Sequence, residues 1–208
     1  RKALAALPNT RIINGYGPTE CTTFAATWSI PHDLADETTS IPIGYPIANT
    51  RLHVLNARGE LLPTGILGEL HIGGAGVARG YLARPELSAE RFVVDPFADS
   101  GSRMYRTGDV VRRLPDGAIE YVGRSDHQVK IRGTRLDLDG IEAVLAAAPG
   151  VLHVVAGAAP DQSALVAAVV PGPAGFDPDA VRAWGRAHLP AVAVPRDIVP
   201  YEKFPETA

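Results

Sequence analysis

The chain has 208 residues, of which 46% are apolar and 21% are charged, and its formal net charge is −3. A chain of this length can bury a core without disulfides, and its single cysteine, Cys21, excludes an intrachain disulfide scaffold and indicates a reducing compartment. The mixed charges exclude a basic nucleic-acid-binding surface. No stretch reaches the roughly 18–20 apolar residues of a membrane span. We therefore expect a cytoplasmic protein without nucleic-acid or membrane partners. Because the sequence starts without methionine, we also expect a fragment.

Short β-like patterns dominate the first 125 residues. We predict strands at 51–55 and 69–72, a turn at 57–59 and a helix at 85–92 with proline in its first turn. Two further strands within 110–122 flank Leu114-Pro115-Asp116-Gly117, whose composition is typical of a tight turn. This segment is predicted to be a β-hairpin.

The pattern changes after Arg124, and we place a domain boundary near Asp126. A strand at 128–132 is followed by a helix with Asp139 as N-cap and Glu142 three residues later, which Gly150 ends. This helix is followed by strands at 151–156 and 164–170, then by a helix that starts at 177–178 and by a last strand. The order β-α-β-β-α-β predicts a small sheet with two helices on one face.

Three polar segments are candidates for chemistry. Residues 14–20, NGYGPTE, offer a ring for a base, a hydroxyl for a phosphate and a carboxylate for Mg²⁺, although a surface turn would have the same composition. In 105–109, YRTGD, the aspartate could bind ribose hydroxyls or be structural. The cations of 123–135 could meet a phosphate or face water.

Other patterns are rejected. The glycines of 74–80 are spaced GxGxxxG, which differs from the dinucleotide fingerprint. The six histidines lack a metal-binding spacing, so a structural metal is not expected. Cys21 is expected to be a packing residue.

Taken in order, NGYGPTE, GELHIGGAGVARGYLARPELSAERF, YRTGD and GRSDHQVKIRGTRL resemble the later core motifs of nonribosomal peptide synthetase adenylation domains. LPAVAVP near the end resembles a further stretch of that family. The resemblance covers essentially the whole chain. It implies a mixed α/β and α+β fold, in which 1–125 end the large adenylation subdomain, with a β-rich barrel-like part, and 126–208 form the small mobile C-terminal subdomain.

The resemblance implies ATP-dependent activation of an amino acid as aminoacyl-AMP and transfer to the phosphopantetheine thiol of a peptidyl carrier protein, in the biosynthesis of peptide antibiotics and other secondary metabolites. It implies ATP and Mg²⁺ as cofactors. Catalytic roles fall on Thr19, Glu20 and Lys130. The residues implied to bind the nucleotide are Gly15, Tyr16, Gly17, Thr19, Asp109 and Arg124. Glu20 would hold Mg²⁺, Asp126 would be the hinge, and Arg132 and Gly133 would face the pantetheine arm.

The resemblance also implies which amino acid is bound and that a helper protein contacts the chain. Gly15, Thr23 and Phe24 would line an apolar substrate pocket like that of valine-activating domains. One methylene in such a pocket changes binding by only about 1–3 kcal/mol, so close analogues of valine would also react. Ala89 occupies the place at which family members accept an MbtH-like protein.

Some family features are absent from this sequence. The phosphate loop and the aspartate for the substrate amino group would lie upstream, and a catalytic lysine would lie downstream, so we expect the isolated chain to be inactive. Gly140 stands where a second glutamate is common. The alternatives are an acyl- or aryl-CoA ligase of the same superfamily, a non-catalytic interaction module, or half of a split enzyme.

Overall fold

The computed structural model describes residues 2–35, 38, 40–126, 128–173 and 175–204. The chain divides into two compact units, residues 1–125 and 126–208, which are described separately below. Both units combine strands and helices, so the expected mixed fold class is confirmed. The two units have separate hydrophobic cores.

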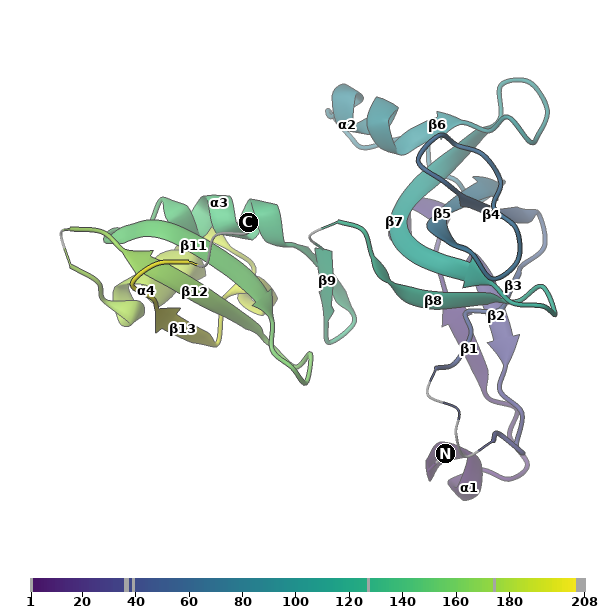
Figure 1. Ribbon diagram of the computed structural model, residues 1–208, viewed down its shortest axis with the longest axis horizontal. Coiled ribbons are helices and arrows are strands. Elements are labelled where there is room, and N and C mark those ends of the chain that lie inside the picture. Colours follow the sequence, from purple (N-terminus) through teal and green to yellow (C-terminus); the bar gives the residue numbers. More distant parts are fainter. Residues whose placement is uncertain (1, 36–37, 39, 127, 174, 205–208) are drawn as a thin grey trace. The chain divides into compact units, whose positions relative to one another are not determined.

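The first unit is mainly β-structure (Figure 1). Its helical elements are α1 (Lys2–Ala6), the 3₁₀ turn η1 (Thr19–Cys21) and α2 (Pro85–Arg91). A small antiparallel sheet contains β1 (Ile13–Tyr16), β2 (Ala26–Ser29) and β3 (Tyr45–Pro46). A larger, curved sheet contains β4 (Thr50–Leu55), β5 (Leu67–Gly74), β6 (Phe92–Val94), β7 (Arg103–Arg113) and β8 (Ile119–Arg124).

Strand β7, the long curved arrow in Figure 1, organises the larger sheet. One edge of β7 pairs with β5 over most of its length. The other edge pairs with β6 near its start and with β8 near its end. Because β6 and β8 pair with the start and the end of β7 on one edge, both ends of the strand are held on two sides, and Asp109 lies where the pairing with β8 begins.

Several local predictions for this unit are confirmed. The strands at 51–55 and 69–72 correspond to β4 and β5, which extend further. The predicted hairpin is β7–β8, and Gly117 adopts a positive φ of 89° in its turn. Helix α2 has Pro85 at its first position, as expected, and ends at Arg91 because Phe92 begins β6.

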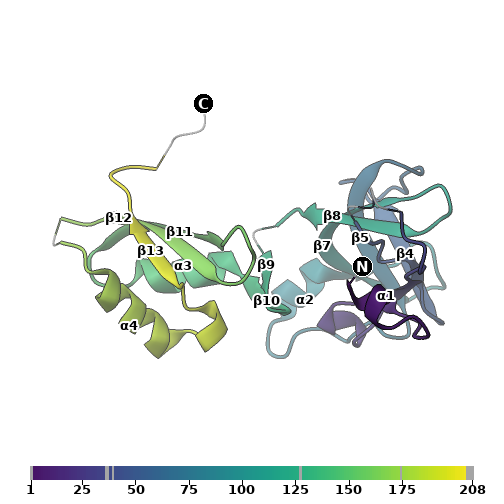
Figure 2. The ribbon, with the colours of Figure 1, turned by 90° about the horizontal axis from the view of Figure 1, so that it is seen from below.

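The second unit contains a two-stranded hairpin and a three-stranded sheet (Figure 2). The hairpin joins β9 (Gln128–Ile131) to β10 (Thr134–Asp137). The sheet has the order β11 (Val151–Ala158), β12 (Leu165–Pro171) and β13 (Asp197–Pro200). The helical elements are α3 (Leu138–Ala146), α4 (Pro178–His188) and the 3₁₀ turn η2 (Ala191–Ala193).

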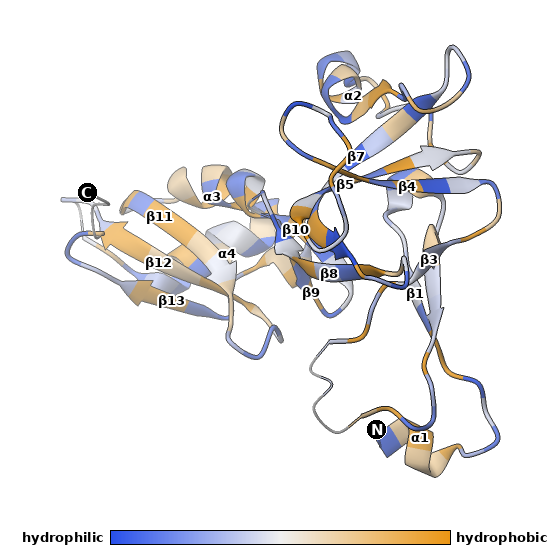
Figure 3. Ribbon diagram, turned by 45° about the vertical axis from the view of Figure 1, so that its right-hand side comes forward, coloured by the Kyte–Doolittle hydropathy of each residue, from blue (hydrophilic) through white to orange (hydrophobic). Residues whose placement is uncertain are grey.

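Both helices of this unit pack on one face of the three-stranded sheet, as predicted. Alternate residues of β12 point to the helices and are buried with Leu145 of α3 and Val181 of α4 in one core. β12 consists of hydrophobic residues from Leu165 to Val170, and the strand is largely orange in Figure 3. Trp184 of α4 donates from its indole nitrogen to the Val144 carbonyl of α3 at 2.9 Å, which joins the two helices. β12 and β13 are parallel, and α4 provides the crossover that such a pair needs.

Three predictions for this unit were wrong. β9 does not join the three-stranded sheet; it pairs with β10, a strand that the sequence analysis missed. Asp139 does not cap α3, because β10 leads directly into the helix and Asp137 takes the N-cap position. Glu142 instead accepts a hydrogen bond from the Ala156 amide of edge strand β11 at 2.8 Å. The helix ends at Ala146, before Gly150, which lies in the following turn.

Candidate active site

The loop between β1 and β2 carries the predicted Thr19 and Glu20, and it is tightly folded. The Ala25 amide donates to the Tyr16 carbonyl at 2.7 Å and closes the loop. A Cβ atom on Gly17 would lie 2.5 Å from the Thr23 carbonyl oxygen, so only glycine fits there. The loop therefore fixes the 3₁₀ turn that carries Thr19, whose side chain is exposed, and Glu20, which is half-buried.

Asp109 lies at the centre of a buried polar cluster. The Tyr16 hydroxyl donates to one oxygen of its carboxylate, and Arg124 donates to the other. The Asp109 amide donates to the Thr107 hydroxyl at 2.9 Å, and Arg124 also donates to the Thr107 carbonyl at 2.8 Å. These contacts join three segments of the chain, and the Tyr16 and Asp109 positions are 93 residues apart. The predicted residues Tyr16, Asp109 and Arg124 therefore lie together.

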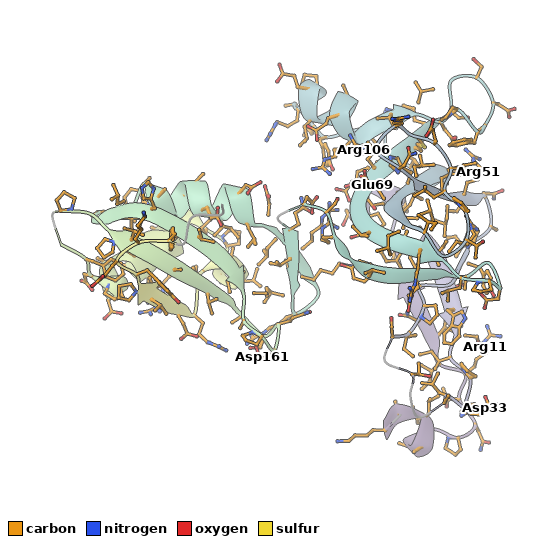
Figure 4. All side chains as sticks on the ribbon, in the orientation of Figure 1. Arg11, Asp33, Arg51, Glu69, Arg106 and Asp161 are labelled. Atoms are coloured by element: carbon orange, nitrogen blue, oxygen red, sulfur yellow. The ribbon has the colours of Figure 1, made fainter. Side chains whose placement is uncertain are left out.

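A β-bulge directs Asp109 into this cluster. The register between β5 and β7 shifts beside Leu70, and Gly108 adopts a positive φ of 73° there. The Thr107 hydroxyl donates to the Leu70 carbonyl at 2.8 Å. The Gly108 amide donates to the Glu69 carboxylate at 3.2 Å, and the same carboxylate accepts from Arg106; Figure 4 labels Glu69 and Arg106 on their neighbouring strands. Bulges of this kind re-aim side chains beside active sites.

Burial controls the electrostatics of the cluster. Burial, and secondly the negative charge of Asp109, raise the pKa of Tyr16 well above its usual value, so its hydroxyl remains a hydrogen-bond donor. The Asp109 and Arg124 side chains are 5% and 8% exposed, and such a buried pair is stable only when further hydrogen bonds satisfy it. Thr107 supplies those contacts. Tyr16 is only 7% exposed, so little of its ring is open to a base.

Glu20 forms a second polar cluster. The Tyr81 and Tyr105 hydroxyls donate to the same oxygen of its carboxylate, at 2.7 and 2.8 Å. The Ala78 amide donates to the Glu20 carbonyl at 2.8 Å. No group of three or more metal-binding side chains occurs in the described part of the chain. A single carboxylate nevertheless fits Mg²⁺, because this ion is usually held by one or two carboxylates together with substrate phosphates.

The three predicted pocket residues occupy neighbouring positions. A Cβ on Gly15 would lie 2.7 Å from Cε1 of Phe24, so the glycine and the ring are in close contact. Phe24 is 51% exposed, and Thr23, which adopts a positive φ of 64°, is exposed as well. The structure therefore places an exposed aromatic surface beside Gly15.

Ala89 lies in α2 and is exposed. The helix is attached to the preceding segment, because the Tyr81 amide donates to the Ser88 hydroxyl at 2.8 Å and that hydroxyl donates to the Arg84 carbonyl at 2.7 Å. The Ala89 side chain is thus presented on an anchored helix.

The remaining predicted residues belong to the second unit, which starts at Asp126. Lys130 is exposed on β9. Arg132 and Gly133 form the two-residue turn of the β9–β10 hairpin, with positive φ values of 50° and 81°. Positive φ at both positions is typical of a type I′ turn, which suits a tight hairpin. Arg132 also donates to the Ser163 carbonyl at 3.0 Å.

Thr107, Tyr81 and Tyr105 are not among the site residues predicted from the sequence. Thr107 and Tyr105 lie within the YRTGD motif, so their proximity to Asp109 was a usable signal. Tyr81 follows a glycine-rich segment and lies 61 residues from Glu20, and no local pattern indicates that contact.

Comparison with known proteins identifies the family of the chain. The AMP-binding enzyme family matches residues 1–82, and the AMP-binding enzyme C-terminal domain matches residues 140–208. The chain belongs to the AMP-binding enzyme family. The first match lies within the first unit and ends before Asp109, and the second lies within the second unit, after the hairpin turn.

Relatives among nonribosomal peptide synthetases span nearly the whole chain. It is 47% identical over 207 residues to tyrocidine synthase 3 of Brevibacillus parabrevis, a match that covers 98% of this chain and 3% of the relative. It is 50% identical over 201 residues to a probable non-canonical nonribosomal peptide synthetase, CymA, of Salinispora arenicola, covering 95% of this chain and 2% of the relative. This AMP-binding chain therefore corresponds to part of a nonribosomal peptide synthetase adenylation domain.

The fold of this AMP-binding chain also matches a solved structure. Holo-PA1221, described as an NRPS protein containing adenylation and PCP domains bound to a vinylsulfonamide inhibitor, aligns with a TM-score of 0.86 and 34% identity. The alignment covers 100% of this chain and 36% of that one. Among the described residues, every helix is too short or too polar to cross a membrane.

Proposed function

We propose that the chain supplies the ribose-binding, metal-binding and carrier-facing parts of an enzyme that activates an amino acid with ATP. In this reaction a carboxylate oxygen of the amino acid attacks the α-phosphorus of ATP, the bond to the β-phosphate breaks, and aminoacyl-AMP and pyrophosphate form. The observation that carries the proposal is the convergence of Tyr16, Asp109 and Arg124 in one buried cluster beside the loop of Thr19 and Glu20.

Asp109 is proposed to bind the ribose hydroxyls. Each carboxylate oxygen has two lone pairs, so an oxygen that accepts from Tyr16 or Arg124 can accept a further hydroxyl. The bulge and the contacts of Thr107 hold the carboxylate in one orientation before the nucleotide binds. Tyr16 has two roles in this proposal: its hydroxyl orients Asp109, and its ring contacts the adenine.

Thr19 and Glu20 are proposed to act at the phosphates, beside Gly17. The exposed Thr19 hydroxyl donates to a phosphate oxygen, and the Glu20 carboxylate holds Mg²⁺ together with phosphate oxygens. When bound, Mg²⁺ neutralises the charge that develops on the phosphoryl oxygens. Arg124 holds its positive charge near the ribose through its contacts with Asp109 and Thr107.

The second half-reaction is proposed to involve the second unit. The thiol of a phosphopantetheine arm on a carrier protein attacks the carbonyl carbon of aminoacyl-AMP, the mixed anhydride breaks, and a thioester and AMP form. Arg132 and Gly133 are proposed to meet the arm, since they form an exposed tight turn, and Lys130 lies on the adjacent strand. Asp126, at the start of the unit, is the proposed hinge.

Valine is the proposed amino acid, and an MbtH-like protein is the proposed helper. The exposed Phe24 ring beside Gly15 forms an apolar wall, and Thr23 lies next to it. Such a wall fits a small branched side chain. The exposed Ala89 on anchored α2 offers a small contact point for the helper.

Amino-acid-dependent ATP–pyrophosphate exchange tests the reaction. The assay uses a complete adenylation domain that contains this chain, with and without an MbtH-like protein, and a panel of amino acids. We expect exchange with valine, weaker exchange with close analogues, and none from the 208-residue chain alone. Exchange with another amino acid would reject the pocket assignment. Formation of a CoA thioester from a carboxylic acid, without exchange on any amino acid, would favour an acyl-CoA ligase.

A further inference from the structure

The Glu20 carboxylate is held by two phenol groups from distant segments. Tyr105 comes from β7 and Tyr81 from the segment before α2, 85 and 61 residues from Glu20. Both hydroxyls donate to the same carboxylate oxygen, at 2.8 and 2.7 Å, and they lie 3.3 Å from each other. The three oxygens thus form a compact triangle. Donors on one oxygen restrict the rotation of the carboxylate and so fix the direction of its second oxygen.

The Tyr81 phenol remains protonated in this environment. Burial, and then the hydrogen bond with Tyr105, raise the pKa of Tyr81. The neutral phenol therefore donates to Glu20 throughout the physiological pH range. A hydrogen bond to a charged acceptor is roughly twice as strong as one between neutral groups, so two phenol donors hold a carboxylate firmly.

Packing fixes the two tyrosine rings in turn. Phe92 packs against both, with its ring centroid 5.3 Å from that of Tyr81 and 5.1 Å from that of Tyr105. Tyr105 is fully buried in the larger sheet. The Tyr81 amide donates to the Ser88 hydroxyl at 2.8 Å. Tyr81 and Tyr105 are therefore placed by the fold and do not depend on Glu20 for their positions.

From this geometry we propose that Tyr81 and Tyr105 are positioning residues, which orient the Glu20 carboxylate toward a divalent cation held between it and the phosphates of the nucleotide. The inference rests on the proposed function, since it takes Glu20 as the protein ligand of that cation. Partners of a metal ligand commonly change metal affinity about 10–100-fold when they are removed.

Tyr81→Phe and Tyr105→Phe test this role, because each keeps the ring and removes only the hydroxyl. Both are made in a complete adenylation domain that contains this chain. Tyr45→Phe is the matched control: its hydroxyl also interacts with a carboxylate, that of Asp116, but it lies outside the Glu20 cluster. Pyrophosphate exchange is measured against Mg²⁺ concentration at saturating ATP. We expect the half-maximal Mg²⁺ concentration to rise about tenfold for each test variant, with the maximal rate within about twofold of wild type.

A binding measurement separates this role from the reaction itself. Free Mn²⁺ is followed by electron paramagnetic resonance in the presence of α,β-methylene-ATP, which cannot form the adenylate. We expect Mn²⁺ affinity to fall about tenfold in both variants and to stay unchanged in Tyr45→Phe. A purely structural role would instead lower the melting temperature and the maximal rate at every Mg²⁺ concentration.

The outcomes are distinguishable. Suppose that the wild-type domain binds Mn²⁺ and that the variants fold. The positioning role is then overturned if the half-maximal Mg²⁺ concentration and the Mn²⁺ affinity of the variants equal those of the wild type. A wild-type domain that binds the Mn²⁺ nucleotide but shows no exchange overturns the proposed reaction, and the Mn²⁺ affinities of the variants then decide the positioning role. A wild-type domain that binds no Mn²⁺ overturns both. If buried Tyr105→Phe fails to fold, half-buried Tyr81→Phe decides the question.

Discussion

Arg124 and Asp109 form an ion pair in which both side chains are almost fully buried. The two residues face each other across β7 and β8, where they are register partners. The ends of this strand pair therefore determine the geometry of the proposed ribose site. The contact also makes the site part of the structural core of the first unit.

Arg124→Met is expected to destabilise the 208-residue chain strongly. It leaves the Asp109 carboxylate buried without its cation, which typically costs about 3–5 kcal/mol of unfolding free energy. Asp109→Asn together with Arg124→Met removes the uncompensated charge and should recover part of this loss. Urea unfolding of the wild type, the two single variants and the double variant gives the coupling free energy. Additive effects would show that the pair is not coupled.

The two glycines beside the Thr19 loop are expected to respond differently to alanine. In Gly17→Ala the new Cβ would meet backbone atoms, 2.5 Å from the Thr23 oxygen and 2.7 Å from the Phe24 Cα, so the unfolding free energy should fall by about 1–3 kcal/mol. In Gly15→Ala the new Cβ would meet only the Phe24 ring, which is exposed and can move. The unfolding free energy should therefore change by no more than about 0.5 kcal/mol.

Thermal unfolding of the two variants compares these effects directly. A larger loss for Gly15→Ala than for Gly17→Ala would contradict the expected order. Gly15→Ala should still displace the Phe24 ring. In the exchange assay of a complete domain, we therefore expect it to shift the preference toward amino acids smaller than valine.

Cys21 is expected to resist alkylation in the folded chain. Burial, and secondly the charge of Glu20, raise the pKa of its thiol to about 12. At pH 8 the thiolate fraction is then about one in ten thousand, compared with about a quarter in an unfolded chain whose thiol has a pKa of about 8.5. Iodoacetamide labelling followed by mass spectrometry should show slow labelling in buffer and rapid labelling in urea. The native rate should rise about tenfold for each pH unit above 8; rapid labelling of the native chain at pH 8 would refute this prediction.

Acid should destabilise the first unit through His53. Burial lowers the pKa of His53. This effect outweighs the charge of Asp95, which raises the pKa and whose Oδ1 lies 3.9 Å from Nε2 of His53. Among the described residues, its Nε2 atom has no hydrogen-bond partner. The unfolded chain therefore binds the proton first, and the unfolding free energy should fall as pH decreases below about 6.5.

Urea unfolding of the 208-residue chain at pH 7.5, 6.5 and 5.5 measures this slope. His53→Phe keeps a ring against Phe97, whose centroid lies 4.7 Å from that of His53, but it cannot take up a proton. The variant should show a shallower slope. Part of the slope should remain, because burial also lowers the pKa of His71. An identical slope in wild type and variant would contradict the assignment to His53.

Gly140→Ala is expected to stabilise the second unit. Gly140 is exposed within α3, and a Cβ there would make ordinary contact with Asp137, 3.4 Å away. Replacement of a helical glycine should raise the unfolding free energy by about 0.5–1 kcal/mol. Fluorescence of Trp184 in a Trp28→Phe background follows the unfolding of this unit.

Gly150→Ala is the matched control for this prediction. Gly150 has a positive φ of 79°, and a Cβ would lie 2.3 Å from the Gly175 oxygen, so this change should destabilise the unit. A loss of stability in Gly140→Ala would show that the N-terminal turn of α3 requires glycine.

The sequence by itself determined the features whose causes lie within a few residues. The turn at 114–117, the proline that starts α2 and the Asp177–Pro178 start of α4 were all predictable, because turn and capping chemistry acts locally. Motif order also determined the family. The N-cap of α3 was misplaced by two residues, because continuity with β10 decided where that helix begins.

Only the tertiary structure decided which side chains meet. Tyr16 reaches Asp109 across 93 residues, and Tyr105 reaches Glu20 across 85. These contacts depend on strand register and on the bulge at Gly108, since a shift of one residue would turn each side chain to the opposite face of the sheet. The sequence therefore indicated which residues carry the chemistry, whereas the packing of the strands determined how those residues are oriented.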